Sequence, residues 1–269
     1  MSDFLEIHRG TAPLVVSFPH TGTDFPPELK EAFVSPWLAR KDADWWIDRL
    51  YAFAHELGAT TVRTRLSRSV IDCNRDPSGA SLYPGQATTG LYPRETFDGE
   101  PLYGENEPDQ AEVELRRTAY FDPYHAALSG EIERLRSSYA HIVLYDAHSI
   151  RSHIPRLFEG ELPQFNIGTN NGETCAHDLE ASVTTIVASS GHSHVLNGRF
   201  RGGWTTRHYG RPADGIHAIQ MELAMRGYME EPALPGPDNW PTPIASQPAI
   251  LPVLQQVLTA CLNFAKGNA

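Results

Sequence analysis

Apolar residues gather in five short runs that have the length and the β-branched or aromatic composition of buried strands. These runs cover 13–19, 59–64, 68–73, 141–146 and 216–223. Four longer segments mix apolar and charged positions and predict helices over 36–57, 110–139, 176–190 and 247–265. Gly58 is a suitable stop for the first helix, and Pro123 predicts a break or kink in the second.

The order of these elements predicts the fold class. Strands that alternate with helices imply an α/β fold with a mixed, mostly parallel sheet. The 269 residues contain no repeat, low-complexity tract or clear linker, so we expect one domain over 1–269. No apolar run approaches 18 residues, and the first residues do not resemble a signal peptide. Three widely spaced cysteines exclude a disulfide framework. We therefore expect a cytoplasmic protein without a membrane partner.

The charge balance narrows the choice of partner. A net charge of -11 argues against a nucleic-acid partner, which would require a basic face. Of the 22 basic residues only Lys30, Lys41 and Lys266 are lysines. A GC-rich genome would explain this bias. Arginine also grips carboxylates through a bidentate fork that lysine lacks. Two clusters would suit a small anionic substrate: Arg63, Arg65, Arg68, Arg75 and Arg199, Arg201, Arg207, Arg211.

Polar side chains follow three of the predicted strands. His20 and His148 each come shortly after an apolar run, and a third run leads into Asp72, Asn74 and Arg75. Parallel strands place such residues along one rim, where α/β sheets bind ligands. Two histidines and a carboxylate are the usual ligands of a hydrolytic zinc ion, although rim histidines can also be purely structural. The chain has no Gly-x-Ser-x-Gly, Gly-x-Gly-x-x-Gly or Walker motif.

The segment 76–109 is turn-rich and long for a loop in a compact domain. Its apolar and aromatic residues suggest an ordered wall or lid; they are Tyr83, Leu91, Tyr92, Phe97 and Tyr103.

Seven segments spread over nearly the whole chain resemble the N-formylglutamate amidohydrolase family. They are 18-FPHTGTDFP-26, 41-KDADWWIDRLY-51, 67-SRSVIDCNRDP-77, 82-LYPGQATTGLYP-93, 145-YDAHSIRS-152, 156-RLFEGELPQFNIGT-169 and 198-GRFRGGWTTRHYG-210. The resemblance implies a three-layer α/β/α fold related to zinc carboxypeptidases and aspartoacylase. It also implies hydrolysis of N-formyl-L-glutamate to L-glutamate and formate, the last step of a histidine degradation route.

The resemblance further implies a set of site residues. His20 matches the first metal ligand and His148 the last. Asn74 and Arg75 match an Asn-Arg pair that binds substrate. Arg68 is then the candidate that polarises the carbonyl. Glu222 is the candidate general base. The implied cofactor is one divalent metal ion, with zinc as the first choice, although the same ligand types also suit manganese, iron, cobalt or nickel.

One position departs from the family pattern. Relatives have a His-x-x-Glu pair, but Thr23 stands three residues after His20. Asp44 is our choice for the middle ligand, because its Asp-Trp element resembles an acidic motif of the family. Asp24 is the alternative, and Asp146 could instead orient a ligand histidine.

The expected substrate carries two carboxylates. Arg75 with Asn74 could hold one, and Arg201 or Arg207 the other, with His208 bonding substrate or an intermediate. Gly202 and Gly203 would allow close backbone approach there, although the segment could also be a structural hairpin. Two alternatives remain: a deacylase of another N-acyl amino acid, or a non-catalytic binder of an acidic amino acid. The absence of glutamate at position 23 is the only sequence support for the binder.

Overall fold

A seven-stranded sheet forms the middle of the molecule in the computed structural model, which describes residues 3–105 and 107–267. The strand order is β1-β3-β2-β4-β7-β5-β6. The strands are β1 Leu5–His8, β2 Leu14–Phe18, β3 Thr60–Thr64, β4 Ile142–Ile150, β5 Phe165–Gly168, β6 His194–Leu196 and β7 Ile216–Ala224. β3, β2, β4 and β7 are mutually parallel. β1 pairs antiparallel with β3, β5 pairs antiparallel with β7, and β6 is parallel to β5. This confirms the mixed, mostly parallel sheet.

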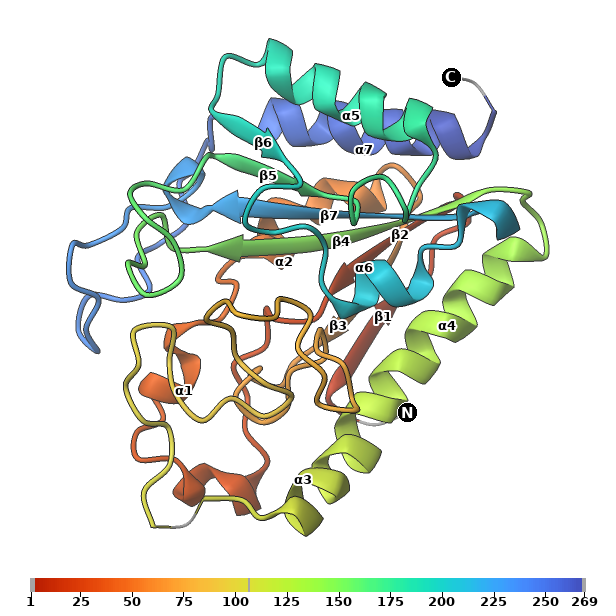
Figure 1. Ribbon diagram of the computed structural model, residues 1–269. Helices are drawn as coiled ribbons and strands as arrows, with labels where there is room; N and C mark the ends of the chain where they lie inside the picture. Colours follow the sequence, from red (N-terminus) through yellow and green to blue (C-terminus); the bar gives the residue numbers. More distant parts are fainter. Residues whose placement is uncertain (1–2, 106, 268–269) are drawn as a thin grey trace.

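Helices cover both faces of the sheet (Figure 1). The α-helices are α1 Leu38–Lys41, α2 Ile47–Leu50, α3 Gln110–Arg116, α4 Asp122–Arg136, α5 His177–Ser189, α6 Trp204–Tyr209 and α7 Leu251–Ala265. The 3₁₀-helical turns are η1 Pro27–Ala32, η2 Ala52–His55, η4 Pro212–Asp214 and η5 Met225–Gly227, and η3 Arg117–Phe121 is a π-helical turn. Helices α5 and α7 pack on one face, and α4 packs on the other. The three layers agree with the expected α/β/α architecture.

The central strands read as continuous apolar runs because both of their faces are covered. Every residue of β2, β4 and β7 is buried. Side chains alternate between the faces, so Leu144 and Ala218 pack under α4 while Tyr145 and Ile219 pack under α5 and α7. Within the described residues, no helix is long and apolar enough to cross a membrane.

The run 68–73 is not a strand, contrary to the sequence prediction. It forms turns in which Val70 N–H donates to Ser67 O and Asp72 N–H donates to Leu91 O. Its apolar residues are buried because Ile71 packs with the α4 side of the core and Val70 with a separate apolar cluster. Burial alone therefore produced a strand-like pattern. The sequence also did not predict β1, β5 and β6, which have only three or four residues each.

The predicted helix 36–57 is broken into α1, α2 and η2. The break falls at Trp46, whose φ of 64° is left-handed, and just before it Asp44 N–H donates to His20 O. The chain thus leaves α1, passes close to His20, and only then starts α2. Gly58 has a φ of 73° and follows η2, which confirms the expected stop.

The predicted helix 110–139 runs through α3, η3 and α4 without a break. Pro123 instead lies in the first turn of α4, directly after the π-helical turn η3. Proline lacks the N–H that a continuous α-helix needs at this point, so the hydrogen-bond pattern widens locally while the helix continues. The predicted helices 176–190 and 247–265 correspond to α5 and α7.

Candidate active site

The candidate site lies at the carboxyl ends of the parallel strands, on the face of the sheet that α4 covers. His148 is the seventh residue of β4 and pairs in register with Glu222 of β7. Because side chains alternate along a strand, His148 and Glu222 share the face of Leu144 and Ala218. His20 reaches the same place from the turn after β2. β4 continues to Ile150, so His148 is held within a strand and not in a flexible exit loop.

His20, Asp44 and His148 form a buried group that could hold a metal ion, with one possible ligand atom of each within 4.8 Å of the others. Asp44 Oδ2 is 2.9 Å from His148 Nδ1 and 3.8 Å from His20 Nδ1. Asp24 lies elsewhere, in an ion pair with Arg65, and half of its side chain is exposed. The break before α2 therefore places a carboxylate beside both histidines, although position 23 holds no glutamate.

A second carboxylate holds the far nitrogen of each histidine. Asp72 Oδ1 is 2.6 Å from His20 Nε2, and Asp146 Oδ2 is 3.1 Å from His148 Nε2. This leaves both Nδ1 atoms facing Asp44. Histidines that bind metals are usually oriented in this way by an outer carboxylate. Two imidazoles and a carboxylate, with both rings fixed from behind, fit a divalent metal ion such as zinc.

The two histidines have opposite electrostatic surroundings. Burial, reinforced by Arg68, lowers the pKa of His20 to about 4. Burial also disfavours the charged form of His148, but Asp146 and Asp44 outweigh it and raise the pKa of His148 well above its usual value. Without a bound cation, Asp44 and Asp146 thus favour the charged form of His148. A bound metal ion would take the place of that positive charge.

Asp72 is the residue whose importance the sequence analysis did not recognise. It accepts from Arg68 Nη2 at 2.6 Å and from the Asn74 N–H at 2.9 Å, in addition to its contact with His20. Burial opposes its charge, but Arg68 and Arg75 hold the pKa of Asp72 well below its usual range. The signal was present in the sequence, since Asp72 sits two residues before the Asn-Arg pair.

Glu222 is buried next to this group, with 7% of its surface exposed. Gln220 Nε2 donates to Glu222 Oε2 at 3.2 Å. Burial raises the pKa of Glu222 to about 8, because the attraction of His148 and Arg68 does not fully offset desolvation and the charges of Asp44 and Asp146. A carboxyl group with a pKa near neutrality can both accept and release a proton, as a general base requires.

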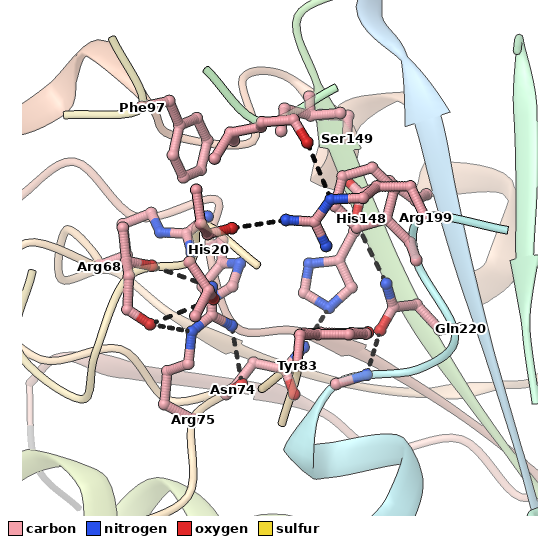
Figure 2. Close-up of a pocket in the computed structure, with 18 residues that line it drawn as sticks. His20, Arg68, Asn74, Arg75, Tyr83, Phe97, His148, Ser149, Arg199 and Gln220 are labelled. Carbon is pink, nitrogen blue, oxygen red and sulfur yellow. Dashed lines mark hydrogen bonds between the residues drawn. The ribbon is translucent and has the colours of Figure 1, made fainter. Parts of the chain in front are cut away.

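The pocket above these residues is lined by three arginines: Arg68, Arg75 and Arg199 (Figure 2). The Arg68 guanidinium lies 4.9 Å from the ring of Phe97, which packs over it. Arg75 donates to Thr89 O at 2.9 Å and to Thr89 Oγ1 at 3.0 Å. A site with this many cations in a protein of net charge -11 suits an anionic substrate.

The loop 76–109 contributes to the pocket wall, as expected. Tyr83, Thr88, Thr89 and Phe97 all line the pocket. The hydroxyl of Tyr83 donates to Gly202 O at 3.0 Å, which ties the loop to the segment before α6.

The structure does not bring Arg201, Arg207 and His208 into the pocket lining. Arg201 is exposed, Arg207 donates to Gly202 O and Leu82 O, and His208 stacks on Trp204 with 4.1 Å between ring centroids. The segment is not a hairpin, because Trp204–Tyr209 forms helix α6. The turn of helix α6 directs Arg207 and His208 away from the pocket. Arg199, the first arginine of the cluster, lines the pocket instead.

The backbone at Gly203 lies close to two side chains of the site. Its N–H donates to Gln220 Oε1 at 2.6 Å, and a Cβ there would lie 2.3 Å from Asn74 Nδ2. Asn74 in turn contacts His148 Nε2 at 2.9 Å and accepts from the Thr205 N–H at 2.8 Å. Asn74 is therefore fixed between the histidine and the start of α6.

The α/β fold and the rim site, with a buried glutamate beside a His-Asp-His group and several arginines, together define a hydrolase with a pocket for a small anion. Comparison with known proteins then identifies the family. The model of the N-formylglutamate amidohydrolase family matches residues 12–229, and the chain belongs to that family.

Two curated relatives carry the name N-formylglutamate deformylase. The protein of Pseudomonas aeruginosa is 48% identical over 235 residues, covering 87% of this chain and 88% of the relative. That of Pseudomonas putida is 47% identical over 233 residues, covering 86% of this chain and 87% of the relative. The crystal structure of N-formylglutamate amidohydrolase from Ralstonia eutropha JMP134 has the same fold, with a TM-score of 0.80, 24% identity and 99% coverage of both chains.

Proposed function

We propose that this protein hydrolyses N-formyl-L-glutamate to L-glutamate and formate, as the last step of a histidine degradation route. The observation that carries the proposal is the buried His20–Asp44–His148 group beside Glu222, in an arginine-lined pocket. Relatives that are nearly half identical and carry the name N-formylglutamate deformylase support the choice of substrate.

The proposed cofactor is one divalent metal ion, with zinc as the first choice, held by His20, Asp44 and His148. Such an ion supplies Lewis acidity and lowers the pKa of water at the site. Asp72 and Asp146 fix the orientation of the two imidazole rings. Asp44 Oδ2 lies near the Nδ1 atoms of both rings, so the three ligand atoms are close together before the ion binds.

Glu222 is the proposed general base. It takes a proton from the attacking water as the new C–O bond forms at the formyl carbon. It then delivers that proton to the amide nitrogen as the C–N bond breaks, so that glutamate leaves as the amine and formate remains. Its raised pKa suits both halves of this transfer. A carboxylate with a raised pKa accepts a proton from water more readily than an ordinary one, and a pKa near neutrality still allows it to release that proton to the nitrogen.

Arg68 is the proposed electrophilic group for the formyl oxygen. Negative charge develops on that oxygen in the tetrahedral intermediate, and a fixed guanidinium stabilises it without having to move. Asp72 holds Arg68 Nη2 at 2.6 Å, and the ring of Phe97 packs over the guanidinium. Asn74 and Arg75 are proposed to bind one carboxylate of the substrate on the same side of the pocket.

The direct test measures formate release from N-formyl-L-glutamate by the purified protein. The protein is assayed as prepared, after removal of metal, and after zinc is restored, with the His148→Ala variant in parallel. We expect activity that is lost on metal removal, returns with zinc, and is absent in the variant. Well-folded protein that releases no formate with any divalent metal would exclude the proposal. A preference for N-formyl-L-glutamine would instead indicate a deacylase with another substrate.

A further inference from the structure

Arg199 differs from the other two arginines of the pocket in its electrostatic surroundings. Arg68 is paired with Asp72, and Arg75 Nη2 also lies 3.7 Å from Asp72 Oδ2. In the described chain, no carboxylate oxygen lies within 4.0 Å of the Arg199 guanidinium nitrogens. Burial lowers the pKa of Arg199, and the charge of Arg75 adds to this effect, while Tyr83 and Glu222 oppose it. Among the described residues, Arg199 is therefore a pocket cation without an ion-pair partner.

The contacts of Arg199 fix its position without neutralising it. Nε donates to Leu157 O at 3.0 Å and Nη2 donates to Ala87 O at 2.6 Å. The guanidinium also lies 5.3 Å from the centres of the Tyr83 and Phe200 rings. Across the residues that the structure describes, Nη1 makes no hydrogen bond. The Arg199 guanidinium is thus held in place, and its Nη1 atom is available to donate to a carboxylate (Figure 2).

We propose that Arg199 binds the side-chain carboxylate of the substrate and determines the preference for an acidic side chain. The inference rests on the proposed function, in which Asn74 and Arg75 bind the other carboxylate. A neutral side chain in the same place would leave the Arg199 charge without a partner. Sites with a polar group left unpaired in this way reject the wrong substrate strongly.

Arg207 provides a matched control within the same segment. Its guanidinium lies 5.1 Å from the centre of the Tyr83 ring, and its Nη1 donates to Leu82 O of the same loop at 3.2 Å. Both arginines therefore hold loop 76–109 against the segment before α6. Only Arg199 lines the pocket, so the two variants separate contact with substrate from support of the loop.

The test compares kcat/KM for N-formyl-L-glutamate and N-formyl-L-glutamine, which differ only in the charge at the end of the side chain. We expect the natural protein to prefer the glutamate by about 100-fold or more, a value below that of fully buried sites because Arg199 is only partly buried. In Arg199→Gln the preference should fall to about tenfold or less, mainly through loss of activity on the glutamate. In Arg207→Gln both values should change by the same factor, so that the preference is retained.

A second variant and a third substrate are added to this comparison. Arg199→Met keeps a long unbranched side chain but removes the charge, and it is measured in parallel, so that a variant that fails to fold does not end the test. N-formyl-L-isoglutamine, the α-amide, identifies the carboxylate: Arg199→Gln should still discriminate against it, whereas Arg75→Gln should not.

The outcomes are separable from failure of the proposed function. If the natural protein releases no formate from either substrate, the proposed function fails. If it is active and selective, and folded Arg199→Gln keeps the same preference, the assignment of Arg199 is overturned while the proposed function stands. Loss of the preference in Arg207→Gln instead, or loss of α-amide discrimination in Arg199→Gln, would also overturn it.

Discussion

Asp44 Oδ2 lies 2.9 Å from His148 Nδ1, although 104 residues separate the two in the chain. The contact forms because β4 carries His148 to the rim of the sheet, and the break between α1 and α2 turns Asp44 toward the same point. The carboxylate also accepts from the Ser149 N–H at 3.2 Å. Asp44 therefore lies where the proposed metal ion would take its middle ligand.

Replacing Asp44 by asparagine should weaken metal binding by about 100-fold or more, because a neutral amide is a much poorer ligand and no longer offsets the charge of the ion. Metal content after dialysis against a graded chelator measures this. Asp24→Asn is the matched control, since Asp24 forms an ion pair with the exposed Arg65, away from the histidines, and its variant should keep its metal. Equal metal retention in the two variants would remove Asp44 from the proposed ligand set.

Replacing Glu222 by glutamine should reduce kcat for formate release by about 10²- to 10⁴-fold, the usual contribution of a general base. The amide is almost the same size, and Gln220 can still contact it, so metal content and thermal unfolding should remain close to those of the natural protein. Steady-state kinetics together with metal analysis check this. A variant that lost its metal along with its activity would indicate a ligand or structural role for Glu222.

Replacing Gly203 by alanine should disturb the site through Asn74. The new Cβ would lie 2.3 Å from Asn74 Nδ2, which must then move away from His148. We expect a loss of about 1–3 kcal/mol in the free energy of unfolding, as for other overpacked positions, and a marked fall in kcat/KM. Urea unfolding and formate release measure the two effects.

Gly130→Ala is the control for that substitution. Gly130 lies within α4, and outside the backbone of that helix no heavy atom of the described residues lies within 4 Å of the added Cβ, so this variant should be as stable as the natural protein or slightly more stable. If Gly203→Ala behaved like Gly130→Ala, the close packing of the α6 start against Asn74 would not constrain the site.

The buried side chain of His125 should make the folded protein less stable in mild acid. Its ring is buried, with Nε2 2.8 Å from Cys73 O and Nδ1 3.1 Å from the Tyr209 hydroxyl. Burial lowers its pKa to about 3, whereas the unfolded chain has the ordinary value near 6.5. Between these values the unfolded state binds more protons, so the stability present above pH 6.5 is lost as the pH falls toward 3.

The size of this effect follows from the two pKa values. At pH 5 the natural protein should have lost about 2 kcal/mol of unfolding free energy through His125, relative to pH 7. His125→Gln, which can still donate to Cys73 O, should be less stable at pH 7 but should lose correspondingly less on acidification. Urea unfolding of both proteins at the two pH values tests this. Parallel losses would mean that other groups cause the acid sensitivity.

The sequence determined the elements that are regular over several residues. Strands β2, β3, β4 and β7 and helices α5 and α7 were predicted at nearly their observed positions, because burial of a repeating element leaves a periodic or continuous apolar pattern. His20 and His148 could be placed on one rim because parallel strands end together. Conversely, 68–73 resembled a strand because a buried turn and a buried strand can share the same composition.

The tertiary structure decided which polar side chains from distant segments meet. Asp24 and Asp44 were both open alternatives in the sequence, and only the left-handed turn at Trp46 shows which of them faces His148. Likewise, the sequence alone does not distinguish between three arginines of one segment: Arg199, Arg201 and Arg207. Arg207 lies in the short helix α6 and donates to Gly202 O and Leu82 O, Arg201 is exposed, and of these three arginines Arg199 lines the pocket. Side-chain direction in irregular segments depends on long-range contacts, and no local pattern encodes these.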